Sequence, residues 1–145
     1  MWFRCLAILV ACAAGGATVA GYVRFLKKRC EEYGRVLDFL SYAEERMRAE
    51  LTSVTSSARS FFGEGAERGA LAAYRYLSPE DREAFEGLLL SSAKPTLEAE
   101  LSRIGEVRDK ILVRFREYKS RVDKNIKIAV TLFSGAALGS ILLLL

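Results

Sequence analysis

Residues 128–145 read IAVTLFSGAALGSILLLL, eighteen consecutive residues without a charge. A helix needs about 20 mostly apolar residues to cross the hydrocarbon core of a bilayer, so this run fits a membrane-spanning helix better than a buried core helix. Ten of the residues are Leu, Ile, Val or Phe, and each favours insertion by about 0.3–0.6 kcal/mol. The sequence therefore predicts a C-terminal transmembrane helix over residues 128–145.

A second uncharged stretch lies near the N-terminus, from Cys5 to Val23. It is richer in Ala and Gly but is also about long enough to cross a bilayer. Trp2 and Tyr22 lie twenty residues apart, which is about 30 Å along a helix and places one aromatic ring at each headgroup level. We therefore expect an N-terminal transmembrane helix in residues 1–23.

An alternative for this first stretch is a processed N-terminus. Ala11-Cys12-Ala13 resembles a signal-peptide cleavage site, and Leu9-Val10-Ala11-Cys12 resembles the lipidation site of a lipoprotein. Only Arg4 supplies the expected N-terminal charge, and the apolar character continues for ten residues beyond Cys12. These features favour a retained helix, and cleavage or lipidation at Cys12 stays open as the alternative.

Basic residues flank both apolar stretches on the side that faces the middle of the chain. Four lie within Arg24–Arg29, and six more lie between Arg114 and Lys127, whereas none follows Lys127. Segments rich in Lys and Arg next to membrane helices stay in the cytoplasm. We therefore predict a multi-pass protein of the cell membrane, with residues 24–127 in the cytoplasm and both termini outside.

Small residues recur at helical spacing in both apolar stretches. They are Ala13, Ala17 and Gly21 in the first stretch and Gly135 and Gly139 in the second. Such patterns let two helix backbones approach closely in lipid. The Gly135/Gly139 face is expected to pack on the small face of the first stretch, or on a second copy of the chain, which would give a homo-oligomer.

The middle of the chain has the apolar spacing of helices and predicts an all-α domain. Apolar residues fall every three or four positions from Val36 to Phe61 and again from Leu97 to Val122. Gly34 is expected to end the first membrane helix, and Ser78-Pro79-Glu80-Asp81 is a typical helix start. We expect an antiparallel helical bundle between two transmembrane helices, with the last long helix running unbroken into residues 128–145.

Composition argues against catalysis and against nucleic-acid binding. The chain has no His, the usual acid–base group near neutral pH and a common zinc ligand. Ser91-x-x-Lys94 lacks the companion motifs of Ser–Lys enzymes, and Gly63-Glu64-Gly65 lacks the context of a phosphate loop. The formal net charge is +4, and the positive excess lies beside the apolar stretches. We expect no catalytic, cofactor or metal site and expect the lipid bilayer, not nucleic acid, as the partner of the basic residues.

Charged residues on the polar face of the first long helix are the expected protein-binding surface. They are Glu45, Arg48 and Arg59. Because the apolar stripe of an amphipathic helix faces the core, the opposite face is free to bind a partner.

Four segments together give a family resemblance that covers most of the chain. They are the basic residues after the first apolar stretch, Arg35–Leu40 leading to Glu50-Leu51, Leu77–Asp81 followed by Phe85–Leu89, and Lys124–Leu145 with its glycines and terminal leucines. In these segments the chain resembles the stage III sporulation protein AB family of endospore-forming bacteria.

This resemblance implies a non-catalytic membrane subunit of the channel complex between mother cell and forespore, on the mother-cell side. Its soluble domain would be similar to the helical cytoplasmic domain of the type II secretion inner-membrane platform protein. The implied partners are a cytosolic secretion-type ATPase and other membrane subunits of the complex. The main alternative of another class is a small pore-forming, holin-like membrane protein, although holins have far less soluble mass than residues 24–127 provide.

Overall fold

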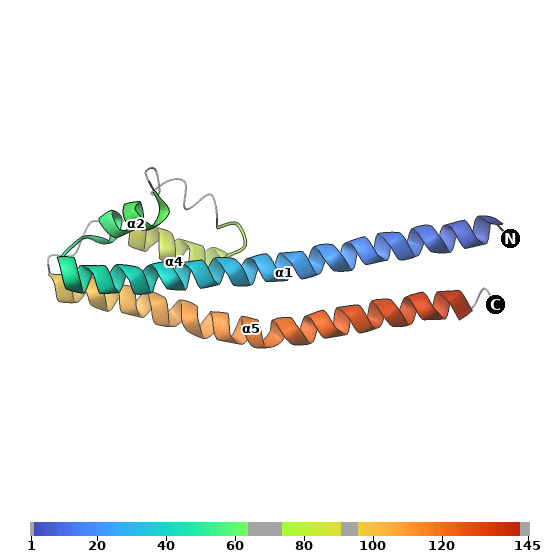
Figure 1. Ribbon diagram of the computed structural model, residues 1–145. Coiled ribbons are helices and arrows are strands. Elements are labelled where there is room, and N and C mark those ends of the chain that lie inside the picture. The colour runs from blue at the N-terminus through green and yellow to red at the C-terminus, as the bar shows by residue number, and fades with distance from the viewer. Residues whose placement is uncertain (1, 64–73, 91–95, 143–145) are drawn as a thin grey trace. The chain divides into compact units, whose positions relative to one another are not determined.

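The computed structural model describes residues 2–63, 74–90 and 96–142. Every regular element in these ranges is an α-helix, so the expected all-α class is confirmed. The helices are α1 (Trp2–Glu50), α2 (Val54–Phe62), α4 (Pro79–Leu90) and α5 (Leu97–Leu142) (Figure 1). The chain divides into two compact units: a terminal unit of Met1–Lys28 with Tyr118–Leu145, and a central unit of Arg29–Glu117.

The first correction concerns Gly34, which does not end the first helix. α1 is a single helix of 49 residues that continues through this position. A Cβ at Gly34 would meet nothing within 4 Å, so no close packing requires glycine there. Glycine inside a helix costs only about 1 kcal/mol relative to alanine. Because long helical flanks and a packed face support α1, this cost is not enough to break it.

The second correction is that Val36–Phe61 is not one helix. α1 ends at Glu50, and Leu51 takes a left-handed conformation with φ 55°. The N–H of Leu51 still donates to the carbonyl of Met47 at 3.1 Å. A left-handed residue that closes such a bond is a common way to end a helix.

A new helix, α2, begins three residues later. The Oγ of Ser53 accepts a hydrogen bond from the N–H of Ser56 at 3.2 Å, which caps the first turn. Val54 and Ala58 of α2 are buried, so the apolar spacing continues across the turn. That continuity is why the sequence pattern alone concealed the break.

The start of α4 agrees with the helix start predicted at Ser78-Pro79-Glu80-Asp81. The N–H of Asp81 donates to the Oγ of Ser78 at 3.2 Å, so Ser78 caps α4 as expected. Phe85, Leu88 and Leu89 of this helix are buried. α5 runs without interruption from Leu97 to Leu142, as the sequence predicted.

Helices α1, α2, α4 and α5 all contribute to the core of the central unit. Phe39 of α1 is fully buried, and its ring centroid lies 4.9 Å from that of Phe62 and 5.8 Å from that of Phe85. Ile104 and Ile111 of α5 are also fully buried. The remaining buried members of this cluster are Tyr33, Val36, Leu40, Ala43, Met47, Val54, Ala58, Tyr74, Leu77, Leu88 and Leu89.

The terminal unit has few buried residues and many exposed apolar ones. Leu26 and Val122 are buried, while large apolar side chains nearer the ends of both helices are exposed. By length and composition, one helix in the described ranges is apolar enough to cross a membrane, the stretch of α1 from Leu6 onward, whose apolar window is not buried at all. A signal sequence passes the same test. The other expected span, residues 128–145, is described only to Leu142.

Candidate interaction surface

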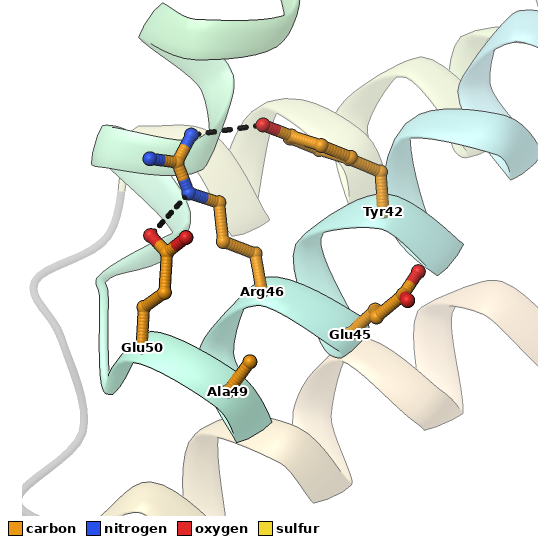
Figure 2. Close-up of a pocket in the computed structure, with 5 residues that line it drawn as sticks. All are labelled: Tyr42, Glu45, Arg46, Ala49 and Glu50. Carbon is orange, nitrogen blue, oxygen red and sulfur yellow. Dashed lines mark hydrogen bonds and ion pairs between the residues drawn. The ribbon is translucent and has the colours of Figure 1, made fainter.

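An open pocket of about 460 Å³ lies beside the C-terminal end of α1. Figure 2 shows the five residues that line it, Tyr42, Glu45, Arg46, Ala49 and Glu50. Their spacing of three and four residues places them on one face of the helix. The pocket therefore lies on one face of α1, where Tyr42 and Arg46 are half-buried and Glu45, Ala49 and Glu50 are exposed.

A fixed guanidinium group forms part of this pocket. The Nε of Arg46 donates to a carboxylate oxygen of Glu50 at 2.8 Å, and its Nη1 donates to the Oη of Tyr42 at 2.8 Å (Figure 2). The hydrogen bond to Glu50 is the main cause that raises the pKa of Arg46, and the bond to Tyr42 adds to it. Arg46 is thus a positioned positive charge, held from both sides.

Glu45 is the acidic side chain of the pocket that has no ion-pair partner within the described residues. Its carboxylate points away from Arg46 in Figure 2. A partner that supplies a basic group could pair with Glu45 without first breaking an internal bond. This is the property that a charged binding surface requires.

Arg48 belongs to an ion cluster on the adjoining face of α1. It donates to Glu44 at 2.8 Å, and the same carboxylate accepts a hydrogen bond from Arg108 of α5. Arg59 lies on α2, where its carbonyl accepts the N–H of Gly63 at 2.9 Å. Of the three residues predicted from the sequence, only Glu45 lines the pocket.

The sequence prediction missed Tyr42, Arg46 and Glu50. These residues are four positions apart along α1, which stacks them on one helix face where polar and charged side chains interact. The spacing alone could therefore have indicated the Tyr42–Arg46–Glu50 row. The prediction instead selected charges for their distance from the apolar stripe.

A second polar group of the central unit is buried. The carboxylate of Asp81 is inaccessible to solvent and accepts hydrogen bonds from the Oη of Tyr33 at 2.6 Å and the Oγ of Ser78 at 2.7 Å. Arg114 of α5 also donates to it at 2.7 Å. Hydrogen bonding to Glu80 is the main cause that raises the pKa of Arg114, followed by the charge of Asp81. This group joins α1, α4 and α5. Its carboxylate already has hydrogen-bond donors within the chain, so its role is structural.

Gly21, Gly135 and Gly139 do not lie at a close contact between the two helices of the terminal unit. A Cβ at Gly21, Gly135 or Gly139 would meet nothing within 4 Å. The close approach is instead made by Phe133, whose ring would lie 2.8 Å from a Cβ at Gly15. The Gly135/Gly139 face is thus open in the single chain, and its packing on a second copy stays a prediction, as do the roles of Ala13 and Ala17.

The described residues contain no group of three or more His, Cys, Asp or Glu side chains that could hold a metal ion. The two weak catalytic patterns, at Ser91 with Lys94 and at Glu64, fall on residues outside the described ranges. No protein family matches the chain, and neither a curated protein nor a solved structure is significantly similar to it. The candidate site is therefore argued from its geometry alone.

Proposed function

We propose that the chain is a non-catalytic, membrane-anchored scaffold whose cytoplasmic helical domain binds a cytosolic secretion-type ATPase. By the family resemblance, it would serve in a sporulation channel complex together with other membrane subunits. The observation that carries the proposal is the continuity of α1. One helix leads from an apolar, uncovered N-terminal segment directly into the packed core of the central unit.

The exposed apolar side chains support membrane anchoring at both ends. Trp2, Phe3 and Leu9 on α1 are at least 70% exposed. Leu132 and Leu142 on α5 have exposed fractions of 68% and 71%. Contact of apolar surface with water costs about 25 cal/mol per Å². Since lipid removes this cost, we propose that residues 1–23 and 128–145 span the bilayer as two transmembrane helices.

The basic residues support the orientation. Arg24–Arg29 and the six Lys and Arg residues from Arg114 to Lys127 lie on the middle side of the two spans. By the positive-inside rule, residues 24–127 are cytoplasmic, where they form the proposed helical bundle. The pocket with Glu45 and Arg46 would then face the cytosol.

The packed central unit favours a scaffold over a small pore-former. Among its described residues, fifteen buried ones form a single cluster, and its exposed surface has paired charges of both signs, such as Arg48 with Glu44. A pore-former needs lipid-facing helices but no such domain. A dye-release assay on liposomes separates the two functions: the scaffold releases no dye, and rapid release would establish the pore.

The proposal is tested in membranes that contain the full chain. The protein should resist alkaline carbonate extraction. A Ser60→Cys variant, made with the native cysteines replaced by alanine, should react in intact cells only with a membrane-permeant thiol reagent. Cross-linking followed by affinity purification should recover an ATPase. Extraction by carbonate, labelling by an impermeant reagent, or recovery of membrane subunits without an ATPase would each contradict the corresponding part of the proposal.

A further inference from the structure

One contact and two buried residues indicate how α1 and α5 are aligned within the terminal unit. The ring of Phe133 lies over Gly15. Leu26 lies eleven residues after Gly15, and Val122 lies eleven residues before Phe133. Both Leu26 and Val122 are buried. The equal spacing places these two side chains at the same level of an antiparallel helix pair, about 16 Å along the axis from the Phe133 contact.

Basic side chains surround this level on both helices. They are exposed, and they form a set that we call the basic collar: Arg24, Lys27 and Lys28 of α1 with Lys119, Arg121, Lys124 and Lys127 of α5. Arg24, Lys27 and Lys28 share one face of α1, which lies opposite Leu26. Asp123 is the one acidic residue in residues 24–28 and 118–127. The seven basic residues of the collar and Asp123 therefore give these two segments a formal net charge of +6.

The collar borders apolar surface directly. Tyr22 and Phe25 are both 42% exposed and lie beside Arg24, and Ile128 is 47% exposed beside Lys127. From here to the ends of both helices, the described residues carry no charge except Arg4. A change from exposed cations to exposed apolar and aromatic side chains matches the boundary between lipid headgroups and acyl chains.

From this arrangement we propose that the basic collar binds the anionic headgroups of phospholipids in the bilayer that surrounds the terminal unit. The inference rests on the proposed membrane anchoring. Lipid phosphate is the complementary charge nearest to the collar when the apolar surface is inserted, and each basic side chain near an anionic membrane surface contributes to binding. A nucleic acid or an acidic protein would not cover the apolar residues next to it.

The test measures lipid selectivity of the full chain reconstituted in phosphatidylcholine vesicles. Spin-labelled phosphatidylglycerol and spin-labelled phosphatidylcholine are compared, and the ratio of their association constants with the protein is determined. The wild-type chain should prefer phosphatidylglycerol, and the preference should fall as salt rises. Replacing three collar residues, Lys27→Gln with Lys124→Gln and Lys127→Gln, should lower the ratio severalfold, toward one.

A matched control removes the same number of positive charges from exposed positions of the central unit, Arg35→Gln with Arg75→Gln and Lys110→Gln. It should keep the wild-type ratio. Equal ratios in collar and control variants, or a wild-type ratio of one, would overturn the inference. Loss of the preference in inorganic phosphate, but not in chloride of equal ionic strength, would also overturn it, because the site would then be one for free phosphate.

Carbonate extraction of the same vesicles separates this inference from the proposed anchoring. An extractable wild-type chain overturns both. A chain that resists extraction but shows no lipid preference overturns the collar inference alone. Because the vesicles have the same lipids in both leaflets, a change of orientation in the collar variant does not alter the ratio.

Discussion

The hydroxyl of Tyr33 on α1 donates a hydrogen bond of 2.6 Å to Asp81 on α4, although forty-eight residues separate them in the sequence. Both residues are almost inaccessible to solvent, with 2% of Tyr33 and none of Asp81 exposed. A carboxylate in such a place is tolerated only when its oxygens have hydrogen-bond donors. Ser78 and Arg114 complete the set, so three helices meet at one charged group.

Removing this carboxylate should destabilise the protein strongly. In Asp81→Ala the buried hydroxyl of Tyr33 loses its acceptor and Arg114 loses one of its two carboxylate partners. We expect a loss of about 3 kcal/mol in the free energy of unfolding. Urea unfolding of the full chain in detergent, followed by circular dichroism, measures it. The control is Glu80→Ala, whose exposed carboxylate should cost within about 1 kcal/mol; equal losses in the two variants would refute the special role of Asp81.

The aromatic cluster gives a second stability prediction. Phe39 is fully buried, with the rings of Phe61, Phe62 and Phe85 within 6 Å of its own. Phe39→Ala should therefore cost about 3–5 kcal/mol, through lost burial and the cavity that it leaves. Val113→Ala, at an exposed position of α5, should stay within about 0.5 kcal/mol. A small loss for Phe39→Ala in the same urea assay would show that α1 and α2 do not share one core.

Local signals explain which parts of the fold could be predicted. The Ser78 cap and the unbroken α5 follow from residues that are neighbours in sequence, and both are confirmed. The end of α1 at Glu50 was missed because α2 resumes the same apolar spacing after the turn. Asp81 looked like an ordinary first-turn acid, since its burial depends on Tyr33 and Arg114 from distant helices. The same applies to the pocket, because local periodicity does not tell which polar face remains uncovered.

The turn after α1 provides a third prediction. Leu51 has φ 55°, a conformation that is unfavourable for a residue with a side chain. The side chain is 76% exposed, so burial of apolar surface does not offset this cost. Leu51→Gly should raise the free energy of unfolding by about 0.5–1 kcal/mol, because glycine adopts this conformation readily. Val113→Gly, at an exposed position inside α5, should have the opposite sign. If the free energy of unfolding fell in both variants, the side chain of Leu51 would be stabilising the turn.

Alkaline pH should weaken the central unit through Tyr74. Burial is the main cause that raises the pKa of this residue from 10.0 to about 12; the charge of Arg35 lowers it and that of Glu32 raises it. Between these two values the folded chain keeps the phenolic proton and the unfolded chain loses it. The contribution of Tyr74 is therefore complete below about pH 10 and is lost as pH rises to about 12, by up to 2–3 kcal/mol. In urea titrations from pH 8 to 12, Tyr74→Phe should flatten this decline, and an unchanged slope would contradict the prediction.

Charge reversal at the pocket tests the proposed partner surface. Glu45 is exposed and makes no hydrogen bond or ion pair within the described residues, so Glu45→Arg should change the free energy of unfolding by no more than about 0.5 kcal/mol. If a basic group of the ATPase pairs with Glu45, the reversal replaces this attraction by a repulsion. The new positive charge then acts on the ATPase group together with that of Arg46, which is held in place. Recovery of the ATPase by the full chain should fall severalfold, and the deficit should shrink at high salt, where charges are screened.

Glu83→Arg, which reverses an exposed acid on α4, is the matched control and should leave recovery unchanged. Equal recovery with Glu45→Arg and wild type would place the ATPase contact elsewhere on the central unit, and equal losses in both variants would show that only the overall charge matters.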